Sequence, residues 1–384
     1  MKTARPKNGA AKVAGKKISG LKVAIVHDWL VGGGAERVVA ELHAMFPDAP
    51  IFTSYCSDEW RARLDGKVVT GFLQRWPFGR LRKFVGFLRM WWFGHLDFSG
   101  YDLVISSTGN GEAKGIRVPE GTAHICYCHA PVHYYWRHYA QYLAHPGFGA
   151  FDPLARVGLR LLVAPMRRWD FKAAQRPDFF IANSTHTARE IKQFYGRDST
   201  VVFPPIDTER FNVPMPKTRR GFVTASRQVP AKRFDIIVEA CNKLKLPLKV
   251  IGNGPEHEHL VALAGAAVSF PAHVSDKQMA GHFVGAEAFL FASYDDFGVV
   301  SVEALAAGTP VIAYKAGGAE DYVVPGKTGL FFDRQTPQAL EKALNEFPKH
   351  TFDNKEIRAF AQKFSAAHFQ ENMQQFIQQV IDAR

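Results

Sequence analysis

The chain has 384 residues, of which 47% are hydrophobic and 22% are charged, and it carries a formal net charge of +12. Such a length and apolar content predict two or three globular domains and exclude a wholly disordered protein. We find no run of about 18 apolar residues, and therefore expect no membrane-spanning helix. Four cysteines without a signal peptide favour a reducing, cytoplasmic location over a disulfide framework.

The first twenty residues form a distinct segment of the sequence. They contain six basic residues and no acidic one, mixed with Gly and Ala, and they lack the apolar core of a signal peptide. We expect residues 1–20 to be a flexible basic tail.

A first block of alternating strands and helices follows the tail. Residues 22–27 are an apolar run typical of a buried strand, and a helix is expected from residue 35 to about 46. Between them, Gly32, Gly33 and Gly34 either let a phosphate approach the helix N-terminus or form a plain tight turn. Because they are contiguous, they do not make the dinucleotide-binding fingerprint. Further strands are expected at 103–106, 124–128, 179–182 and 201–203.

A basic and aromatic segment lies inside this block. Between Lys67 and Leu96 the sequence has no acidic residue, and its cations alternate with aromatic residues. This pattern is typical of surfaces that bind anionic membranes. The residues singled out for such an acceptor or membrane surface are Arg75, Trp76, Arg80, Arg82, Lys83, Trp91 and Trp92. A second stretch, Leu154–Trp169, has the same character.

Two alternatives to membrane binding remain open. The net charge would also suit a nucleic acid, but no nucleic-acid-binding module is visible, so we expect no nucleic-acid partner. The segment could equally be a helix packed within the first domain, with its cations solvated.

His129 follows the expected strand 124–128 and is followed in turn by Pro131. A histidine just beyond a strand end is well placed to meet a substrate. His124, Cys126 and Cys128 raise a metal site as an alternative, since they alternate along the strand. Zinc sites usually use C-x(2–4)-C turns instead, and we expect no metal.

Prolines at 204–205 and 214–216 mark a linker to a second block. Strand and helix alternate again, which predicts a second parallel sheet covered by helices on both faces. The expected strands are 222–225, 248–251, 288–292, 311–313 and 330–332, with a helix at 234–244. We place the domains at 21–205 and 218–360, with ligands bound in the cleft between them. A last helix, about 361–381, has no strand after it.

The segment 295–311 reads DDFGVVSVEALAAGTPV, with Asp295 and Glu303 eight positions apart. The loop Phe297-Gly298-Val299-Val300 would place backbone N–H groups at a helix N-terminus, where a phosphate oxygen is favoured. Two carboxylates beside an anion site suit a phosphate flanked by two polyols, as in a nucleotide-sugar. The alternative is a solvated acidic loop before an ordinary amphipathic helix.

Two cations follow the expected strand 222–225. Arg227 offers a planar fork and Lys232 a point charge, which together suit a diphosphate, or they are simply solvated surface cations. The turn Gly252-Asn253-Gly254-Pro255 follows the next strand in the same way.

Together these motifs resemble the retaining glycosyltransferases of the GT-B fold, group 1 or family GT4. Phe297-Gly298, Val302-Glu303-Ala304, Ala307-Gly308 and Pro310-Val311 fall where that family has them. Asp295 departs from the pattern, because the family usually has Glu there. Gly317-Gly318 resembles the family's Gly-Gly loop, although Asp321 again replaces a Glu. The His-x-Pro element at His129 is similar to that of bacterial mannosyltransferases.

The resemblance implies two Rossmann-like domains facing a cleft, with a C-terminal helix, 364–384, that crosses back to the first domain. It also implies the roles of the site residues. Arg227 and Lys232 would bind the donor diphosphate, Asp295 the sugar hydroxyls and Glu303 the ribose. Gly33 and Gly34 would line the diphosphate, Gly252 and Gly254 the base region, and His129 the donor sugar or the acceptor hydroxyl.

The function that the resemblance implies is transfer of mannose from GDP-mannose to a polyprenyl-diphosphate-linked oligosaccharide, at the inner face of the cell membrane. We expect no cofactor and no metal, because the chain lacks the D-x-D triplet of the unrelated GT-A enzymes. The alternatives are a UDP-hexose transferase, a UDP-sugar epimerase of the same fold, or a non-catalytic membrane scaffold that binds a nucleotide-sugar.

Overall fold

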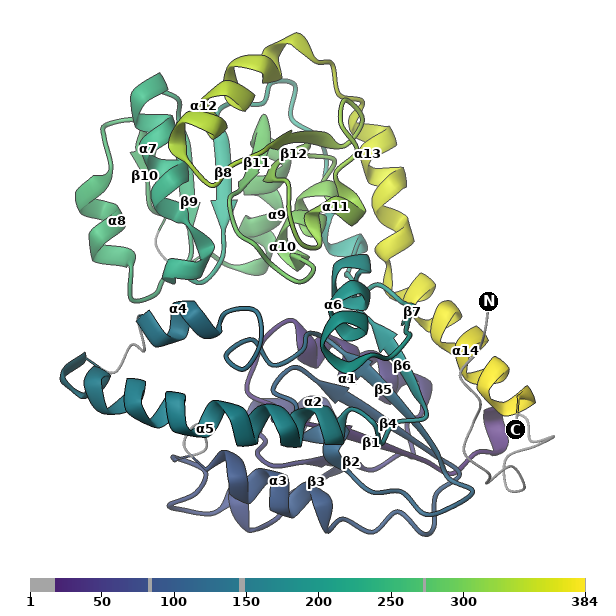
Figure 1. The fold of residues 1–384 in the computed structure, drawn as a ribbon. Helices are drawn as coiled ribbons and strands as arrows, with labels where there is room; N and C mark the ends of the chain where they lie inside the picture. Colours follow the sequence, from purple (N-terminus) through teal and green to yellow (C-terminus); the bar gives the residue numbers. More distant parts are fainter. Residues whose placement is uncertain (1–17, 82–84, 145–148, 272–273, 384) are drawn as a thin grey trace. The chain divides into compact units, whose positions relative to one another are not determined.

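The computed structural model describes residues 18–81, 85–144, 149–271 and 274–383 (Figure 1). The chain divides into two compact units. Unit 1 is Met1–Pro204 together with Gln370–Arg384, and unit 2 is Pro205–Phe369. Residues 1–17 of the expected basic tail lie outside the described residues, and Ile18–Gly20 form a short 3-10 helix.

Unit 1 is built on a seven-stranded sheet with the order β3-β2-β1-β4-β5-β6-β7, in which every pairing is parallel. Its strands are β1 Val23–His27, β2 Ile51–Thr53, β3 Val68–Val69, β4 Leu103–Thr108, β5 Ala123–Cys128, β6 Phe179–Ala182 and β7 Thr200–Val201. The strand order reverses between β1 and β4. In open parallel sheets, the loops at the carboxyl ends of such a strand pair are where ligands bind.

The helices of unit 1 are α1 Ala35–Met45, α2 Asp58–Arg63, α3 Gly86–Gly94, α4 Tyr139–Ala144, α5 Asp152–Ala173 and α6 Thr185–Tyr195. Helix α14, Ala366–Asp382, joins them from residue 370 onward. The ring of Phe376 in α14 meets that of Phe179 edge-on at 6.2 Å. Gln370 Nε2 donates to Glu41 Oε2 at 2.7 Å. The C-terminal helix thus packs on unit 1.

The expected single helix at 361–381 is wrong in one respect. The structure has α13 Asn354–Ala361, a 3-10 turn Gln362–Phe364, and then the separate α14. Ser365 lies between them with extended backbone (φ −65°, ψ 158°), and its Oγ accepts from His368 N at 3.3 Å. A serine hydroxyl in this geometry caps a new helix, and therefore ends the old one.

Unit 2 has a six-stranded parallel sheet in the order β10-β9-β8-β11-β12-β13. Its strands are β8 Phe222–Ala225, β9 Leu248–Ile251, β10 Val268–Ser269, β11 Ala288–Phe291, β12 Val311–Tyr314 and β13 Gly329–Phe332. Its helices, apart from α13, are α7 Phe234–Leu244, α8 His257–Leu263, α9 Asp276–Gly285, α10 Val299–Ala306, α11 Ala319–Tyr322 and α12 Pro337–Glu346. Here the strand order reverses between β8 and β11.

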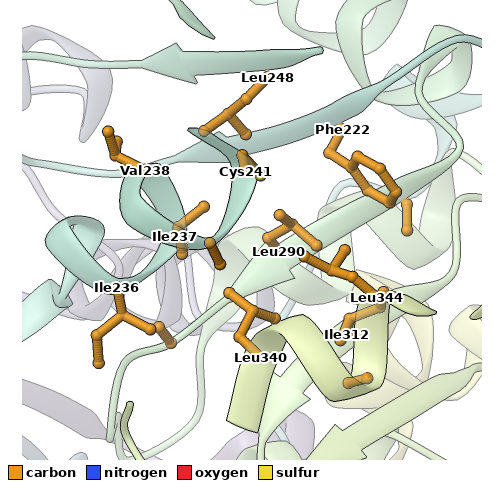
Figure 2. Close-up of a cluster of buried hydrophobic side chains, with 14 of the residues drawn as sticks. Phe222, Ile236, Ile237, Val238, Cys241, Leu248, Leu290, Ile312, Leu340 and Leu344 are labelled. Atoms are coloured by element: carbon orange, nitrogen blue, oxygen red, sulfur yellow. The ribbon is translucent and has the colours of Figure 1, made fainter. Parts of the chain in front are cut away.

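The core of unit 2 forms where α7 and α12 cover the sheet (Figure 2). Helix α7 contributes Ile237 and Cys241, and α12 contributes Leu340 and Leu344. Each pair is spaced four apart, which places both side chains on one helix face. They pack with Phe222, Leu248, Leu290 and Ile312 from four neighbouring strands. Burying each large apolar side chain contributes about 1.5–3 kcal/mol.

The expected strands of both blocks are present, with ends that shift by up to two residues. Three strands escaped prediction: β2, β3 and β10 contain three, two and two residues. Runs this short have too few side chains for a recognisable alternation. β3 and β10 also lie at the sheet edges, where pairing on one side suffices.

Candidate functional site

The carboxyl ends of β8 and β11 carry three of the predicted charged residues of unit 2. Arg227 lies two residues after β8 and is exposed, and Lys232 ends the 3-10 helix Pro230–Lys232 in the same loop. Asp295 lies four residues after β11. Because β8 and β11 are neighbours and the strand order reverses between them, the loops at their carboxyl ends are where a ligand is expected to bind.

Asp295 is held at both carboxylate oxygens. Lys232 Nζ donates to Oδ2, and Ser293 Oγ donates to Oδ1. Ser293 Oγ also lies 3.4 Å from the carbonyl of Ala231, which ties the loop after β11 to the loop after β8. The side chains of Lys232 and Asp295 are 23% and 22% exposed, so both charges remain within reach of a ligand. Sequence reasoning missed Ser293, whose one signal was its position two residues before the carboxylate.

The Gly317-Gly318 loop supports Asp295 from the side of β12. Gly318 N donates to the carbonyl of Asp295 at 2.9 Å. A Cβ on Gly317 would lie 2.2 Å from that carbonyl oxygen, and one on Gly318 would lie 2.3 Å from Phe297 Cα. The two loops touch through their backbones, so only glycine fits at these positions.

Helix α10 begins directly after the loop that carries Asp295. Its N-cap, Gly298, is in the left-handed region with φ +91°, and a Cβ there would lie 2.5 Å from Tyr322 Oη. Val299 and Val300 form the first helical turn and are half-buried. The first N–H groups of a helix have no intrahelical acceptors and lie at the positive end of its dipole, which suits them to a phosphate oxygen.

Two predicted residues of this segment face inward. The ring of Phe297 is buried against Tyr322 and Phe364, at centroid distances of 5.8 and 5.6 Å. The ring of Phe297 is therefore not available to a ligand, and the expected contact by its backbone N–H stays a prediction. Glu303 is also buried, in the second turn of α10.

Gly252 and Gly254 have a packing role in the structure. A Cβ on Gly252 would lie 2.0 Å from Ser226 O, and one on Gly254 would lie 2.2 Å from Gln228 O. Gln228, which sequence reasoning missed, donates from Nε2 to Gly252 O at 2.9 Å. The loop after β9 is thus closely packed on the loop that carries Arg227. Donor binding by the two glycines stays a prediction.

In unit 1 the glycine loop at residues 32–34 contacts the carboxylate of Glu36. Glu36 Oε1 accepts from Gly32 N at 3.0 Å, and a Cβ on Gly33 would lie 2.9 Å from Glu36 Oε2. Glu36 is buried, whereas Gly33 and Gly34 are exposed. A diphosphate role for Gly33 and Gly34 stays a prediction.

His129 lies where β5 ends, near the carboxyl ends of β1 and β4. Its Nε2 lies 2.8 Å from Ser107 Oγ in β4. Just after β1, the buried carboxylate of Asp28 accepts from Gly109 N at 2.9 Å and from Asn110 N and Ala113 N at 2.8 Å. Asp28 therefore shapes the loop after β4. Sequence reasoning missed both Ser107 and Asp28, although polar residues ending an apolar strand were a usable signal.

The residues of the alternative metal site are buried within β5. His124 Nε2 lies 2.8 Å from Ser106 Oγ, and burial lowers the pKa of His124 to about 3. Burial raises the pKa of the Cys126 thiol to about 12. Both groups are therefore held in their neutral forms by the core of the sheet.

The basic and aromatic surface is present in part. Trp76 is 82% and Trp91 55% exposed, and Arg75 and Arg80 are exposed as well. Trp92 corrects the prediction: it is only 9% exposed and packs in the core of unit 1 beside Phe93. Arg82 and Lys83 lie outside the described residues.

Helix α5 corresponds to the second predicted stretch. Leu154 and Leu161 on α5 are each 71% exposed, seven positions apart on one face of the helix, and Arg160 and Arg168 are exposed beside them. Among the helices of the described ranges, none combines the length and apolarity needed to cross a membrane.

Two family models match the chain. Residues 205–364 match the model "Glycosyl transferases group 1", and residues 32–210 match "Glycosyltransferase Family 4". The two models meet at the junction between the units and together span residues 32–364.

Curated relatives agree with these models at modest identity. A "D-inositol 3-phosphate glycosyltransferase" of Streptomyces scabiei is 29% identical over 50% of this chain and 50% of its own length. A "GDP-mannose-dependent alpha-(1-6)-phosphatidylinositol monomannoside mannosyltransferase" of Mycolicibacterium smegmatis is 30% identical over 52% of this chain and 65% of its own. The chain thus spans about half the length of the first of these relatives and under two thirds of the second.

Solved structures match nearly the whole fold. Anabaena HepE in complex with UDP has a TM-score of 0.68 at 18% identity, over 94% of this chain and 100% of its own. The lipopolysaccharide outer core galactosyltransferase WaaB has a TM-score of 0.65 at 17% identity, over 93% and 99%. The likeness confirms the expected fold, with two Rossmann-like parallel-sheet domains.

Proposed function

This chain belongs to the group 1 glycosyltransferases of family 4, and on that premise we propose that it transfers a sugar from a nucleotide-diphosphate donor to a hydroxyl group. The observation that carries the proposal is the convergence of Arg227, the Lys232–Asp295 pair and the α10 N-terminus at the strand reversal of unit 2. Cations and a helix N-terminus there suit a diphosphate, and the carboxylate suits sugar hydroxyls.

The reaction we propose proceeds with retention at the anomeric carbon. The acceptor oxygen forms its bond to that carbon on the face from which the diphosphate leaves, while the bond from carbon to the β-phosphate oxygen breaks. The acceptor proton passes to the departing phosphate oxygen. Arg227 and Lys232 stabilise the negative charge that grows there, and one well-placed donor of this kind supplies about 3 kcal/mol of transition-state stabilisation.

Asp295 has two tasks in this proposal. It pairs with Lys232, and its remaining lone pairs accept from hydroxyls of the donor sugar. Glu303 binds the ribose, and His129 of unit 1 serves the donor sugar or the acceptor. No metal or cofactor is part of the proposal, so added EDTA should leave the rate unchanged.

For the donor we propose GDP-mannose. The name of the mycobacterial relative supports this choice, because that enzyme is GDP-mannose-dependent. The complex of HepE with UDP keeps a UDP-hexose as the alternative donor. A thermal-shift panel of GDP-mannose, UDP-glucose, UDP-galactose and ADP-glucose tests the choice. GDP-mannose should give the largest rise in melting temperature, and a larger rise with a UDP-sugar would replace it.

For the acceptor we propose a lipid-linked oligosaccharide at an anionic membrane surface, on its cytoplasmic face. Support comes from the exposed Trp76 and Trp91 with their neighbouring arginines, and from the exposed leucines of α5. The test incubates the protein with labelled donor and a polyprenyl-diphosphate oligosaccharide in anionic vesicles. Label in the lipid fraction supports the proposal, whereas a new free or nucleotide-linked sugar without acceptor would identify an epimerase.

A further inference from the structure

Three side chains at the carboxyl edge of the unit 1 sheet form one chain of hydrogen bonds. His27 Nδ1 lies 2.9 Å from the backbone carbonyl of Ser107 and 3.1 Å from Ser107 Oγ. Ser107 Oγ lies 2.8 Å from His129 Nε2. His27 and Ser107 are buried, and the ring of His27 meets that of His129 edge-on at a centroid distance of 6.3 Å. The three residues come from β1, β4 and the end of β5.

The carbonyl oxygen fixes the direction of the first of these bonds, and that bond favours one direction for the others. A backbone carbonyl only accepts, so His27 Nδ1 must carry a proton and donate it toward Ser107. The Ser107 hydroxyl, which faces the same N–H, accepts on that side. Its own proton is then available to His129 Nε2. A neutral His129 that accepts at Nε2 carries its proton on Nδ1.

We propose that Ser107 and His27 are positioning residues, which hold His129 as its neutral Nδ1–H tautomer with a fixed ring orientation. His129 then carries its ring proton on Nδ1 and cannot act as the base that removes the acceptor proton through Nε2. This inference rests on the proposed function for its catalytic meaning, where the leaving phosphate takes that proton. The tautomer itself does not depend on the reaction.

The direct test is a long-range 15N–1H spectrum of the full chain labelled with 15N-histidine, in which a His129→Gln variant assigns the His129 signals. We expect a protonated Nδ1 and an unprotonated Nε2 for His129 in the wild type. Ser107→Ala should mix in the Nε2–H tautomer, and Ser107→Thr, which keeps the hydroxyl, should restore the wild-type pattern. An Nε2–H tautomer in the wild type, or an unchanged spectrum in Ser107→Ala, overturns the proposal.

The adjacent strand position supplies a matched control. Ser106 is equally buried, and its Oγ lies 2.8 Å from Nε2 of His124, so Ser106→Ala also deletes one serine–histidine bond between β4 and β5. Both alanine variants should lose similar stability, but only Ser107→Ala should alter the His129 spectrum. A change of that spectrum in Ser106→Ala as well would show general loosening of the sheet, and would contradict the assignment of Ser107 as the residue that positions His129.

Kinetics separate this inference from the proposed function. In a transfer assay, Ser107→Ala should lower kcat by up to about tenfold, which corresponds to the loss of one hydrogen bond. The KM for the donor should be nearly unchanged. His27→Asn, whose amide N–H replaces Nδ1–H, should lose less than His27→Ala. If the wild type shows the expected tautomer but transfers no sugar, the proposed function fails and the tautomer assignment stands. If it transfers sugar and Ser107→Ala is as fast as wild type, the positioning role fails.

Discussion

Lys232 and Asp295, 63 positions apart in the sequence, form an ion pair that joins the loops leaving β8 and β11 in unit 2. The pair couples a cation suited to the donor diphosphate with a carboxylate suited to the donor sugar. Asp295 is one methylene shorter than the Glu that the family resemblance led us to expect. Ser293 donates to the second carboxylate oxygen, so both oxygens of the shorter side chain are hydrogen-bonded.

Asp295→Asn should slow transfer more than it destabilises the fold. The change removes the acceptor of a charged hydrogen bond, which is worth about 1.5–3 kcal/mol, and thus should lower kcat/KM by about 10- to 150-fold. Because Lys232 and Asp295 are both partly exposed, we expect little change in the free energy of unfolding. Steady-state kinetics and urea unfolding measure the two effects. Asp333→Asn, at an exposed carboxylate just after β13, is the control and should behave as wild type.

Arg227→Ala should abolish measurable transfer and weaken binding of the nucleoside diphosphate, because a cation beside the leaving phosphate is lost. Isothermal titration with the diphosphate and a transfer assay test both effects. The strand β8 supplies the control: Arg220 is an exposed arginine just before the strand, at the end opposite to Arg227. Arg220→Ala should retain binding and rate. Near wild-type transfer by Arg227→Ala would contradict the proposed site.

Much of this site could be predicted from the sequence, because its residues follow apolar runs and parallel strands end at a common edge. Arg227, Lys232, Asp295 and the α10 N-terminus were found in this way. Their mutual contacts could not be predicted, since the sheet order that makes β8 and β11 neighbours depends on long-range packing. Ser293 and Gln228 belong to these contacts and were therefore missed.

The start of a short helix is a second feature that could not be predicted from the sequence. Helix α3 starts at Gly86, which turns Arg89, Trp92 and Phe93 toward the interior. Arg89 pairs there with the buried Glu112 at 2.6 Å. Without the start of the helix, the sequence does not show which of the alternating cations and aromatic residues face the interior.

Replacement of glycine by alanine should change stability in opposite directions at Gly318, in the loop after β12, and at Gly281, in α9. Gly318→Ala forces a Cβ to 2.3 Å from Phe297 Cα, so the Asp295 loop must shift. We expect lower stability, by on the order of 1–3 kcal/mol, together with weaker donor binding. Gly281, exposed within α9, has no atom within 4 Å of an added Cβ. Gly281→Ala should instead stabilise the protein by about 0.5–1 kcal/mol. Thermal unfolding of both variants checks the signs.

Membrane binding should depend on the exposed leucines of α5. Each leucine that enters the membrane interface contributes up to about 1.5–3 kcal/mol, so the double variant Leu154→Ser/Leu161→Ser should bind anionic vesicles at least about tenfold more weakly. Co-sedimentation with phosphatidylglycerol vesicles measures this, and phosphatidylcholine vesicles should bind less from the start. Val261→Ser, at an exposed apolar residue of α8 in unit 2, is the control. Equal binding by all three proteins would exclude α5 as the docking surface.

Stability at acid pH should depend on His124. Burial lowers its folded-state pKa to about 3 from 6.5. Between these two pH values His124 is therefore protonated in the unfolded chain and neutral in the native state. The contribution of His124 is thus complete above pH 6.5 and is lost as the pH falls toward 3, at no more than about 1.4 kcal/mol per pH unit.

His124→Gln removes this titrating group, and its unfolding free energy should fall less steeply with acid than that of the wild type. Glu112 acts in the opposite direction, because burial raises its pKa to about 7 and the native state holds a proton more tightly between pH 4.5 and 7. The comparison between His124→Gln and wild type cancels the Glu112 contribution. Parallel slopes between pH 4 and 6.5 would contradict the assignment of His124.

Helix α14 makes unit 1 discontinuous in sequence, since residues 1–204 are completed only by residues 370 onward. Unit 2 is one uninterrupted length of the chain, whereas Phe179 of unit 1 meets its partner ring in α14 only once the residues from 370 onward have been made. The part of the protein that is made first is therefore finished last. A chain cut before residue 370 would keep the whole sequence of unit 2 and would uncover the surface of unit 1 at Phe179.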